Sequence, residues 1–177
     1  MKNFCLISIF LAILVSLPIS IAANNGVREK YNFNPQWFLH IGDIEGAEKV
    51  DFPDKNWKKI TLPHAFNEDE AFKVNIKDMT DTIVWYRKHF KLPKTARGKK
   101  VFIEFEGVRQ AADFYLNGKH IGLHENGVMA VGFDLTPYLN FGGENVIALR
   151  IDNDWRYKER ATGSLFQWND RNFNANY

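Results

Sequence analysis

The residues that come nearest to a catalytic arrangement are two glutamates, Glu104 and Glu106. They alternate with apolar residues, so they would share one face of an extended strand at a separation of roughly 7 Å. Paired carboxylates at such a separation can act as an acid and a base. The pair must flank the bond that is cut, however, whereas two neighbours on a strand point the same way out of the sheet. We therefore interpret both glutamates as a solvated face and predict no catalytic residue in the chain.

Two histidines, His120 and His124, are the strongest candidates for metal ligands. They are four positions apart in an extended segment that contains Gly122, which would put them on one face about 13 Å from each other. A zinc site needs four ligands that converge, and no third ligand is close in the sequence. We expect neither a metal site nor a cofactor.

A polar cluster follows the last alternating segment of the chain. Asp152 and Asn153 end that segment, and Asp154 and Trp155 come directly after it. A polar pair at the end of a strand can turn the chain or bind a ligand. An aromatic face beside carboxylates suits the stacking and hydrogen bonding of sugars, and it equally suits packing against another domain. The sequence leaves both interpretations open.

The segments that must position these residues are short and are bounded by Gly, Pro, Asn or Asp, which is typical of β-strands. One short helical signal lies at 136–139, where a threonine cap precedes a proline. An irregular stretch at 64–81 is long enough that we expect it to be functional or to contact another domain. The sequence therefore predicts an all-β sandwich, with strands at 37–41, 57–62, 82–92, 100–108, 132–135 and 144–151 and a hairpin within 108–127.

The hairpin is predicted by its turn and by its alternation. Asn117-Gly118 supplies the two positive-φ residues that a type I′ turn requires. After the turn, Ile121 and Leu123 would resume the apolar alternation of the first strand. The apolar residues before the turn are Ala112, Phe114 and Leu116. We assign the hairpin to the scaffold of the sandwich.

The N-terminal segment 1–22 has the features of a secretory signal peptide. One lysine precedes an apolar stretch, Pro18 interrupts the stretch, and small residues follow at Ala22 and Ala23. The stretch is shorter than the roughly 20 residues that cross a membrane. We expect cleavage near Ala22 or Ala23, export of the mature domain to the periplasm or the medium, and no membrane partner. Cys5, the only cysteine, would leave with the signal.

The charge of the chain argues against nucleic-acid binding. The 177 residues include 23 Lys or Arg and 21 Asp or Glu, for a net charge of +2. No basic stripe in the sequence could neutralise several phosphates at once, so we expect no nucleic-acid partner. The length and the 45% hydrophobic content suit one globular domain with a substantial core.

Five segments together carry a family pattern: WKKITLPHAFN (57–67), VWYRKHFKLP (84–93), FEGVRQAADFYLNGKHIGLHENG (105–127), FDLTPYL (133–139) and GENVIALRIDN (143–153). In order and spacing they resemble the N-terminal domain of glycoside hydrolase family 2, the family of β-galactosidases, β-glucuronidases and β-mannosidases. The resemblance covers the chain from about Trp37 to its end. It implies a jelly-roll β-sandwich, galactose-binding-domain-like, over residues 23–177.

In this family, catalysis takes place in a downstream barrel, where two glutamates act in a retaining mechanism. The resemblance therefore implies an accessory domain of an exported enzyme, expected to be a β-galactosidase, whose C-terminal end is incomplete here. The implied partners are a carbohydrate with a terminal β-linked sugar and the downstream domains of the same enzyme. A stand-alone carbohydrate-binding module and a purely structural domain remain the alternatives.

The resemblance also implies substrate-binding residues. In family β-galactosidases, an aspartate in the loop after the corresponding strand contacts hydroxyls of the terminal sugar. Asp152 is the position matched to that aspartate, and Asp154 is the alternative. Asn75 is a weaker match to an asparagine that the same enzymes direct to the same sugar. The expected substrate-binding set is therefore Asp152, Asn153, Asp154, Asn75 and Trp155.

Overall fold

The computed structural model describes residues 28–67, 82–125 and 129–154. The predicted signal peptide, Asn75 and Trp155 lie outside these described residues. Among the described residues, no helix is both long and apolar enough to cross a membrane. Their regular structure consists of strands and two short 3₁₀ helices, so the predicted all-β class is confirmed.

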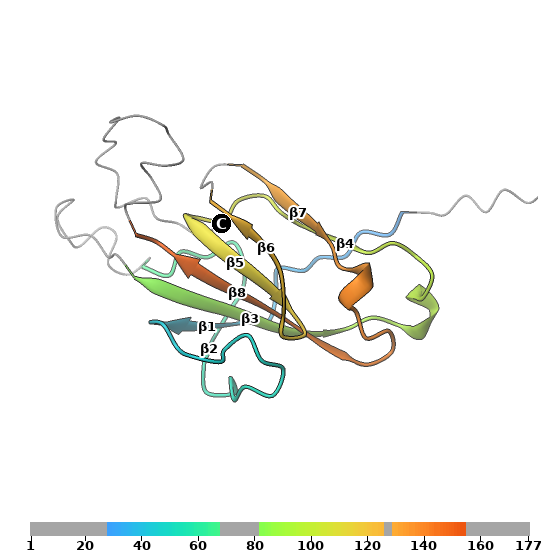
Figure 1. Ribbon diagram of the computed structural model, residues 1–177, viewed down its shortest axis with the longest axis horizontal. Coiled ribbons are helices and arrows are strands. Elements are labelled where there is room, and N and C mark those ends of the chain that lie inside the picture. Colours follow the sequence, from blue (N-terminus) through green and yellow to red (C-terminus); the bar gives the residue numbers. More distant parts are fainter. Residues whose placement is uncertain (1–27, 68–81, 126–128, 155–177) are drawn as a thin grey trace, which may run out of the picture. The chain divides into compact units, whose positions relative to one another are not determined.

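Six strands form one antiparallel sheet: β1 (Trp37–Ile41), β2 (Lys58–Ile60), β3 (Ile83–Lys91), β5 (Ala111–Leu116), β6 (Lys119–His124) and β8 (Glu144–Asp152). Their order in the sheet is β2-β1-β3-β8-β5-β6 (Figure 1). The two long strands, β3 and β8, lie at the centre and pair along their whole length. All six elements lie where the sequence predicts strands, with ends that differ by up to three residues.

A second sheet of two strands, β4 (Phe102–Phe105) and β7 (Val131–Asp134), covers one face of the first sheet (Figure 1). The 3₁₀ helix η1 (Lys94–Ala96) connects β3 to β4, and η2 (Thr136–Tyr138) connects β7 to β8. A proline stands in the first turn of η2, where its missing N–H breaks no helical hydrogen bond. The predicted threonine cap is wrong: Leu135 is the N-cap, and the hydroxyl of Thr136 accepts instead from the N–H of Val101. The two sheets make the sandwich that the sequence predicts.

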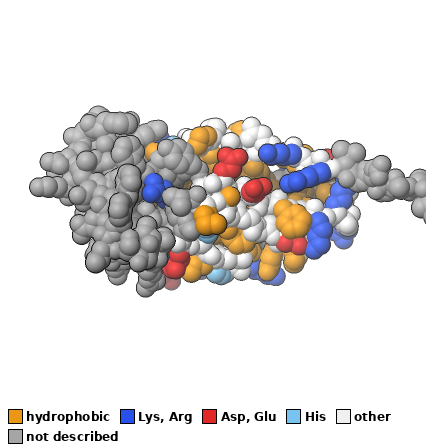
Figure 2. All heavy atoms as spheres, turned by 90° about the horizontal axis from the view of Figure 1, so that it is seen from above, with side chains coloured by type: hydrophobic (Ala, Val, Ile, Leu, Met, Phe, Trp, Pro, Cys, Tyr) orange, Lys and Arg blue, Asp and Glu red, His pale blue; other side chains and the backbone are white. Residues whose placement is uncertain are grey.

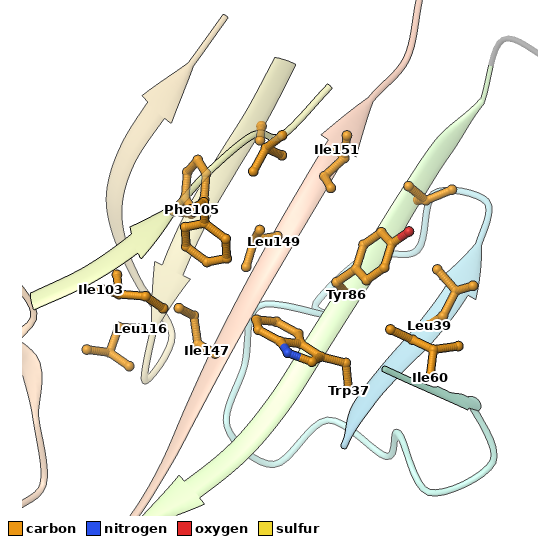
Figure 3. Packing of buried hydrophobic residues seen from close by; sticks show 14 of the residues in the cluster. Trp37, Leu39, Ile60, Tyr86, Ile103, Phe105, Leu116, Ile147, Leu149 and Ile151 are labelled. Carbon is orange, nitrogen blue, oxygen red and sulfur yellow. The ribbon is translucent and has the colours of Figure 1, made fainter. Parts of the chain in front are cut away.

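The hydrophobic core lies between the two sheets (Figure 3). Alternation along the strands puts every second side chain of the six-stranded sheet on this inner face. Trp37 of β1 is 1% exposed, and its ring centroid lies 6.3 Å from that of Phe105 on β4. Burial of each large apolar side chain contributes about 1.5–3 kcal/mol. This packing fixes the two sheets against each other.

The loop that joins β1 to β2 covers part of the opposite, outer face of the six-stranded sheet. Beneath it, Arg87 of β3 is fully buried. Its Nε donates to Oδ2 of Asp54 at 2.7 Å, and its Nη1 donates to the backbone carbonyls of Ala47 and Lys49. Burial raises the pKa of the Asp54 carboxyl, but hydrogen bonds from Arg87 and His89 outweigh burial and lower that pKa overall. A buried charge pair therefore anchors this loop to the sheet.

The predicted hairpin is confirmed, with positive φ at Asn117 (51°) and Gly118 (77°). Its pairing contains a register shift, where β6 carries one extra residue opposite β5. Such a β-bulge exchanges the two faces of the bulged strand. As a result, Ile121 packs against the core while Leu123 is 53% exposed. The prediction that these two residues continue one alternation is wrong for this reason.

The same bulge separates the two histidines of the hairpin. His120 lies on the outer face, where its Nε2 is 2.9 Å from Oδ1 of Asp113. His124 lies on the inner face, opposite Ala112, whose side chain belongs to the core. The prediction that His120 and His124 share one face is wrong, because it assumed a strand without a bulge.

Candidate functional site

Strand β8 ends where several of its neighbours begin or end. Asp152 pairs with Ile83 at the start of β3 and with Ala111 at the start of β5. Strand β6 finishes at the same edge with His124. Four strand ends therefore meet at one end of the sandwich (Figure 1). We call residues 152–154 the strand-end site.

The strand-end site is folded as a tight turn. The backbone N–H of Asp154 donates to Oδ1 of Asp152 at 3.0 Å, a common local bond of aspartate. Asn153 is fully buried, and its backbone N–H donates to the carbonyl of Thr82 at 3.1 Å. Asp152 and Asp154 are both half-buried. Asn153 thus fixes the backbone, whereas the two aspartates present side-chain atoms to solvent.

Two polar residues that we did not single out from the sequence adjoin this site. Arg109 and Gln110 immediately precede β5, and Gln110 is 3% exposed. Because Ala111 pairs with Asp152, Gln110 lies across from Asn153 in the sheet. The available signal was a pair of polar residues between two apolar stretches, which marks the start of a strand at a sandwich end.

The outer face of the six-stranded sheet carries a second candidate site. A shallow hollow of about 700 Å³, wide open to solvent, lies on this face. Its lining comes from the β1–β2 loop, the central strands and the β5–β6 hairpin. We call it the outer hollow, and its lining residues are Asp43, Ile44, Glu45, Gly46, Glu48, Trp85, Tyr115, Gly118, His120 and Arg150.

An ion pair fixes one wall of the outer hollow. Oδ2 of Asp43 accepts from Nη2 of Arg150 at 2.6 Å. Oδ1 of Asp43 accepts from Nε of Arg150 at 3.0 Å and from Nε1 of Trp85 at 3.1 Å. The hydrogen bonds from Arg150 lower the pKa of Asp43, and the same bonds raise the pKa of Arg150. The two residues are 107 positions apart, so sequence spacing gave no sign of this pair.

Aromatic side chains form another part of the outer hollow. The rings of Trp85 and Tyr115 are nearly parallel, at 28°, with centroids 6.0 Å apart. The ring of His120 meets Tyr115 edge-on, with centroids 5.2 Å apart. Burial raises the pKa of Tyr115, and the nearby carboxylates of Asp113 and Glu48 raise it further. The phenol is therefore neutral at ordinary pH and can donate a hydrogen bond.

The glutamates considered for catalysis belong neither to the strand-end site nor to the lining of the outer hollow. Glu104 and Glu106 are exposed, whereas Ile103, which precedes them, and Phe105, which lies between them, are buried. The interpretation of a solvated face is therefore confirmed. On the face seen in Figure 2, most basic side chains lie toward one end, and a few acidic side chains stand among hydrophobic and uncharged ones. Within the described ranges, no three His, Cys, Asp or Glu residues are grouped so that they could hold a metal ion.

Two facing antiparallel sheets with the core between them define a β-sandwich domain. The chain belongs to glycoside hydrolase family 2. Its residues 56–176 match the family described as "Glycosyl hydrolase 2 galactose-binding domain-like".

Characterised relatives agree with this assignment. The chain is 47% identical to a β-glucuronidase of Formosa agariphila over 134 residues, which are 72% of this chain and 14% of that protein. It is 39% identical to a β-galactosidase of Thermoanaerobacter pseudethanolicus over 127 residues, which are 71% of this chain and 17% of that protein. The chain thus spans about a sixth or less of the length of these larger enzymes.

Solved structures show the same fold. A β-glucuronidase from glycoside hydrolase family 2 superposes with a TM-score of 0.65 at 47% identity, over 70% of this chain and 14% of that chain. A β-glucuronidase of Bacteroides uniformis superposes with a TM-score of 0.66 at 32% identity, over the same shares.

Proposed function

We propose that this chain is the N-terminal jelly-roll domain of an exported family 2 glycosidase and that it helps to bind the terminal sugar of a β-glycoside. The strand-end site supports this proposal most strongly. There, the half-buried carboxylate of Asp152 stands where four strand ends meet. The catalytic acid and the nucleophile would lie in a downstream barrel that acts by a retaining mechanism.

Asp152 is suited to hold sugar hydroxyls. Its Oδ1 already accepts the N–H of Asp154, which fixes the orientation of the carboxylate, and its Oδ2 can accept from a ligand. A hydrogen bond to a charged acceptor is about twice as strong as one between neutral groups. Asn153, fully buried, would hold the turn in place. Asn75 and Trp155, which lie outside the described residues, complete the proposed set of sugar contacts.

The substrate is the finer part of the proposal. From the sequence we expect a β-galactosidase, and the relative at 39% identity is one. The relative at 47% identity is a β-glucuronidase, and so are the two similar solved structures. We therefore put a β-glucuronide first and a β-galactoside second.

Hydrolysis assays test this function directly. The full-length enzyme that contains this domain should hydrolyse nitrophenyl β-glucuronide with a higher kcat/KM than the β-galactoside or the β-mannoside. The 177-residue chain alone should hydrolyse none of the three. A full-length enzyme that is inactive toward all three would contradict the proposal. Turnover by the chain alone that disappears in Glu104→Gln would instead place catalysis in this domain.

A further inference from the structure

We propose that the outer hollow is a second carbohydrate-binding site, separate from the strand-end site, that takes a neutral pyranose unit of a β-linked oligosaccharide. The choice of a carbohydrate rests on the function proposed above. The site itself rests on the shape, the aromatic side chains and the charges of the hollow.

The aromatic part of the hollow is rigid. Tyr115 projects from the outer face of β5, where it is half-buried, and its ring is held by Trp85 on one side and His120 on another. Trp85 is itself fixed by the bond from its Nε1 to Asp43. A flat side chain that is already immobilised loses little conformational freedom when the apolar face of a sugar ring packs against it. This is the first requirement of a sugar platform.

Hydrogen-bond acceptors stand beside this platform. Asp43 is occupied by Arg150 and Trp85, so it acts as part of the wall. Glu45 and Glu48 also line the hollow, one exposed and one half-buried, and both carboxylates can accept from sugar hydroxyls. The hydroxyl of Tyr115 can donate in return. The hollow therefore combines an apolar plane with polar groups of both kinds, as sugar recognition requires.

The charges of the hollow select against an anionic sugar. Three carboxylates line it, from Asp43, Glu45 and Glu48, against one guanidinium, that of Arg150. That guanidinium is already paired with Asp43, and the ring of His120 is paired with the Asp113 carboxylate. A uronate would therefore meet uncompensated negative charge. A neutral hexose unit would not.

The outer hollow lies close to the strand-end site. Arg150 and Asp152 share the outer face of β8 and are two residues apart, which corresponds to roughly 7 Å. An oligosaccharide held in the hollow would thus lie near the end of β8, where the terminal sugar is proposed to bind. The hollow would serve to retain a longer saccharide rather than to select its terminal unit.

Titration of the isotope-labelled 177-residue chain with β-1,4-linked galactotetraose, followed by NMR, tests this inference. We expect the amide signals of Gly46, Tyr115 and His120 to shift in a saturable way, and a β-linked glucuronate oligosaccharide to leave them unchanged. Tyr115→Ala should weaken binding at least about tenfold, whereas Tyr115→Phe should retain most of it. Glu104→Gln, an exposed carboxylate outside the hollow, is the matched control and should bind normally.

Two outcomes would overturn the inference: an absence of shifts at millimolar tetrasaccharide, and binding that survives Tyr115→Ala. If Tyr115→Ala does not fold, Glu48→Gln preserves the packing and should weaken binding up to about tenfold; unchanged affinity in that variant counts against the site. The full-length enzyme separates this inference from the proposed function. If the enzyme hydrolyses nitrophenyl glycosides but does not bind the tetrasaccharide, only the second binding site is contradicted. If it binds the tetrasaccharide but hydrolyses none of the glycosides, only the proposed function is contradicted.

Discussion

The two ends of strand β8 use their polar side chains in opposite ways. At its start, Asn145 is fully buried and all its side-chain groups are bonded. Its Oδ1 accepts from the backbone N–H of Asn140 at 2.7 Å and from Nδ2 of Asn117 at 2.9 Å. Its Nδ2 donates to the carbonyls of Asn140 and Gly143. At its other end, Asp152 accepts one such bond, from Asp154, among the described residues.

This difference separates a structural polar group from one that can bind a ligand. A buried side chain whose donors and acceptors are all used inside the domain stabilises the fold and has no capacity left for a ligand. A half-buried carboxylate with an oxygen that faces solvent retains that capacity. The start of β8 is also anchored from outside, because His89 bridges Asp54 of the β1–β2 loop and Glu144 of β8.

The largest effect is expected from Asp54→Asn, which leaves the guanidinium of Arg87 buried without its counter-charge. Loss of one partner of a buried ion pair should lower the free energy of unfolding at neutral pH by about 3 kcal/mol or more. Urea denaturation measures this loss. An equally destabilised Glu104→Gln, where the carboxylate is exposed, would show that the effect is not specific to the anchor.

Acid should erase the difference between Asp54→Asn and the native chain. The pKa of Asp54 is lowered in the folded state from an ordinary value of 3.8, so the unfolded chain binds its proton first as the pH falls. The stability that this carboxylate contributes is therefore complete well above pH 4 and is lost as the pH falls through the folded-state pKa. A difference that stays constant down to about pH 2 would contradict the assignment.

Asn145→Leu should lower the free energy of unfolding somewhat less than Asp54→Asn does. The change has nearly the same volume, but it leaves the backbone N–H and carbonyl of Asn140 without the Asn145 side chain, and it removes one of the two acceptors of the Asn117 amide. Buried groups that lose a hydrogen bond cost about 1–3 kcal/mol in the free energy of unfolding. Thermal or urea unfolding should show a loss of that size with unchanged kinetics of the full-length enzyme. If Asn145→Leu were as stable as the native chain, the two ends of β8 would not differ as described.

Asp152→Ala in the full-length enzyme should impair catalysis and leave stability nearly unchanged, the opposite of what is expected from Asn145→Leu. Loss of a charge-assisted bond to a sugar hydroxyl should lower kcat/KM roughly ten- to 150-fold, while the free energy of unfolding changes by less than about 1 kcal/mol. Steady-state kinetics and urea denaturation of the same preparation measure both. Asp113→Ala is the matched control on the same outer face, and its kinetics should be normal.

Two further variants distinguish the alternatives at the strand-end site. If Asp152→Ala is normal while Asp154→Ala or Asn75→Ala loses activity, the sugar contact belongs to one of those residues. If all three variants are kinetically normal, the domain is structural, and the comparison between the ends of β8 has no functional meaning.

Local patterns were sufficient to predict most of the fold. Each strand lies within two or three residues of its predicted position, because period-two alternation and turn residues are properties of neighbouring positions. The turn at Asn117-Gly118 is an example, since both residues have the positive φ that the type I′ turn requires. The bulge in β6 could not be predicted, because it depends on how two strands pair. It therefore reversed the expected faces of Leu123 and His124.

The candidate sites were predictable to a lesser degree. The polar turn at residues 152–154 was visible because its members are adjacent in the sequence and follow a clear strand. The outer hollow was not, since Asp43 and Arg150 are brought together only when the β1–β2 loop folds over the sheet. The burial of Arg87 could not be predicted either. A charged residue in a strand is normally expected to face solvent, and Arg87 is buried only because the β1–β2 loop folds over it.

The smallest effect is expected from Glu144→Gln, at the exposed side of the His89 bridge. Both ring nitrogens of His89 face carboxylate oxygens, Nε2 toward Asp54 at 2.8 Å and Nδ1 toward Glu144 at 2.9 Å. The Asp54 side chain is 5% exposed, whereas that of Glu144 is 55% exposed. Water and salt screen the second interaction, so Glu144→Gln should change the free energy of unfolding by no more than about 0.5 kcal/mol.

Urea denaturation at low and high salt separates the two halves of this bridge. The small effect of Glu144→Gln should vanish in high salt, because an exposed pair is screened over a few ångströms of solvent. The loss in Asp54→Asn should persist, because its partner Arg87 is fully buried. A loss in Glu144→Gln that equals the loss in Asp54→Asn and resists salt would mean that the start of β8 is held by the whole bridge, and that burial does not decide which polar groups stabilise this end.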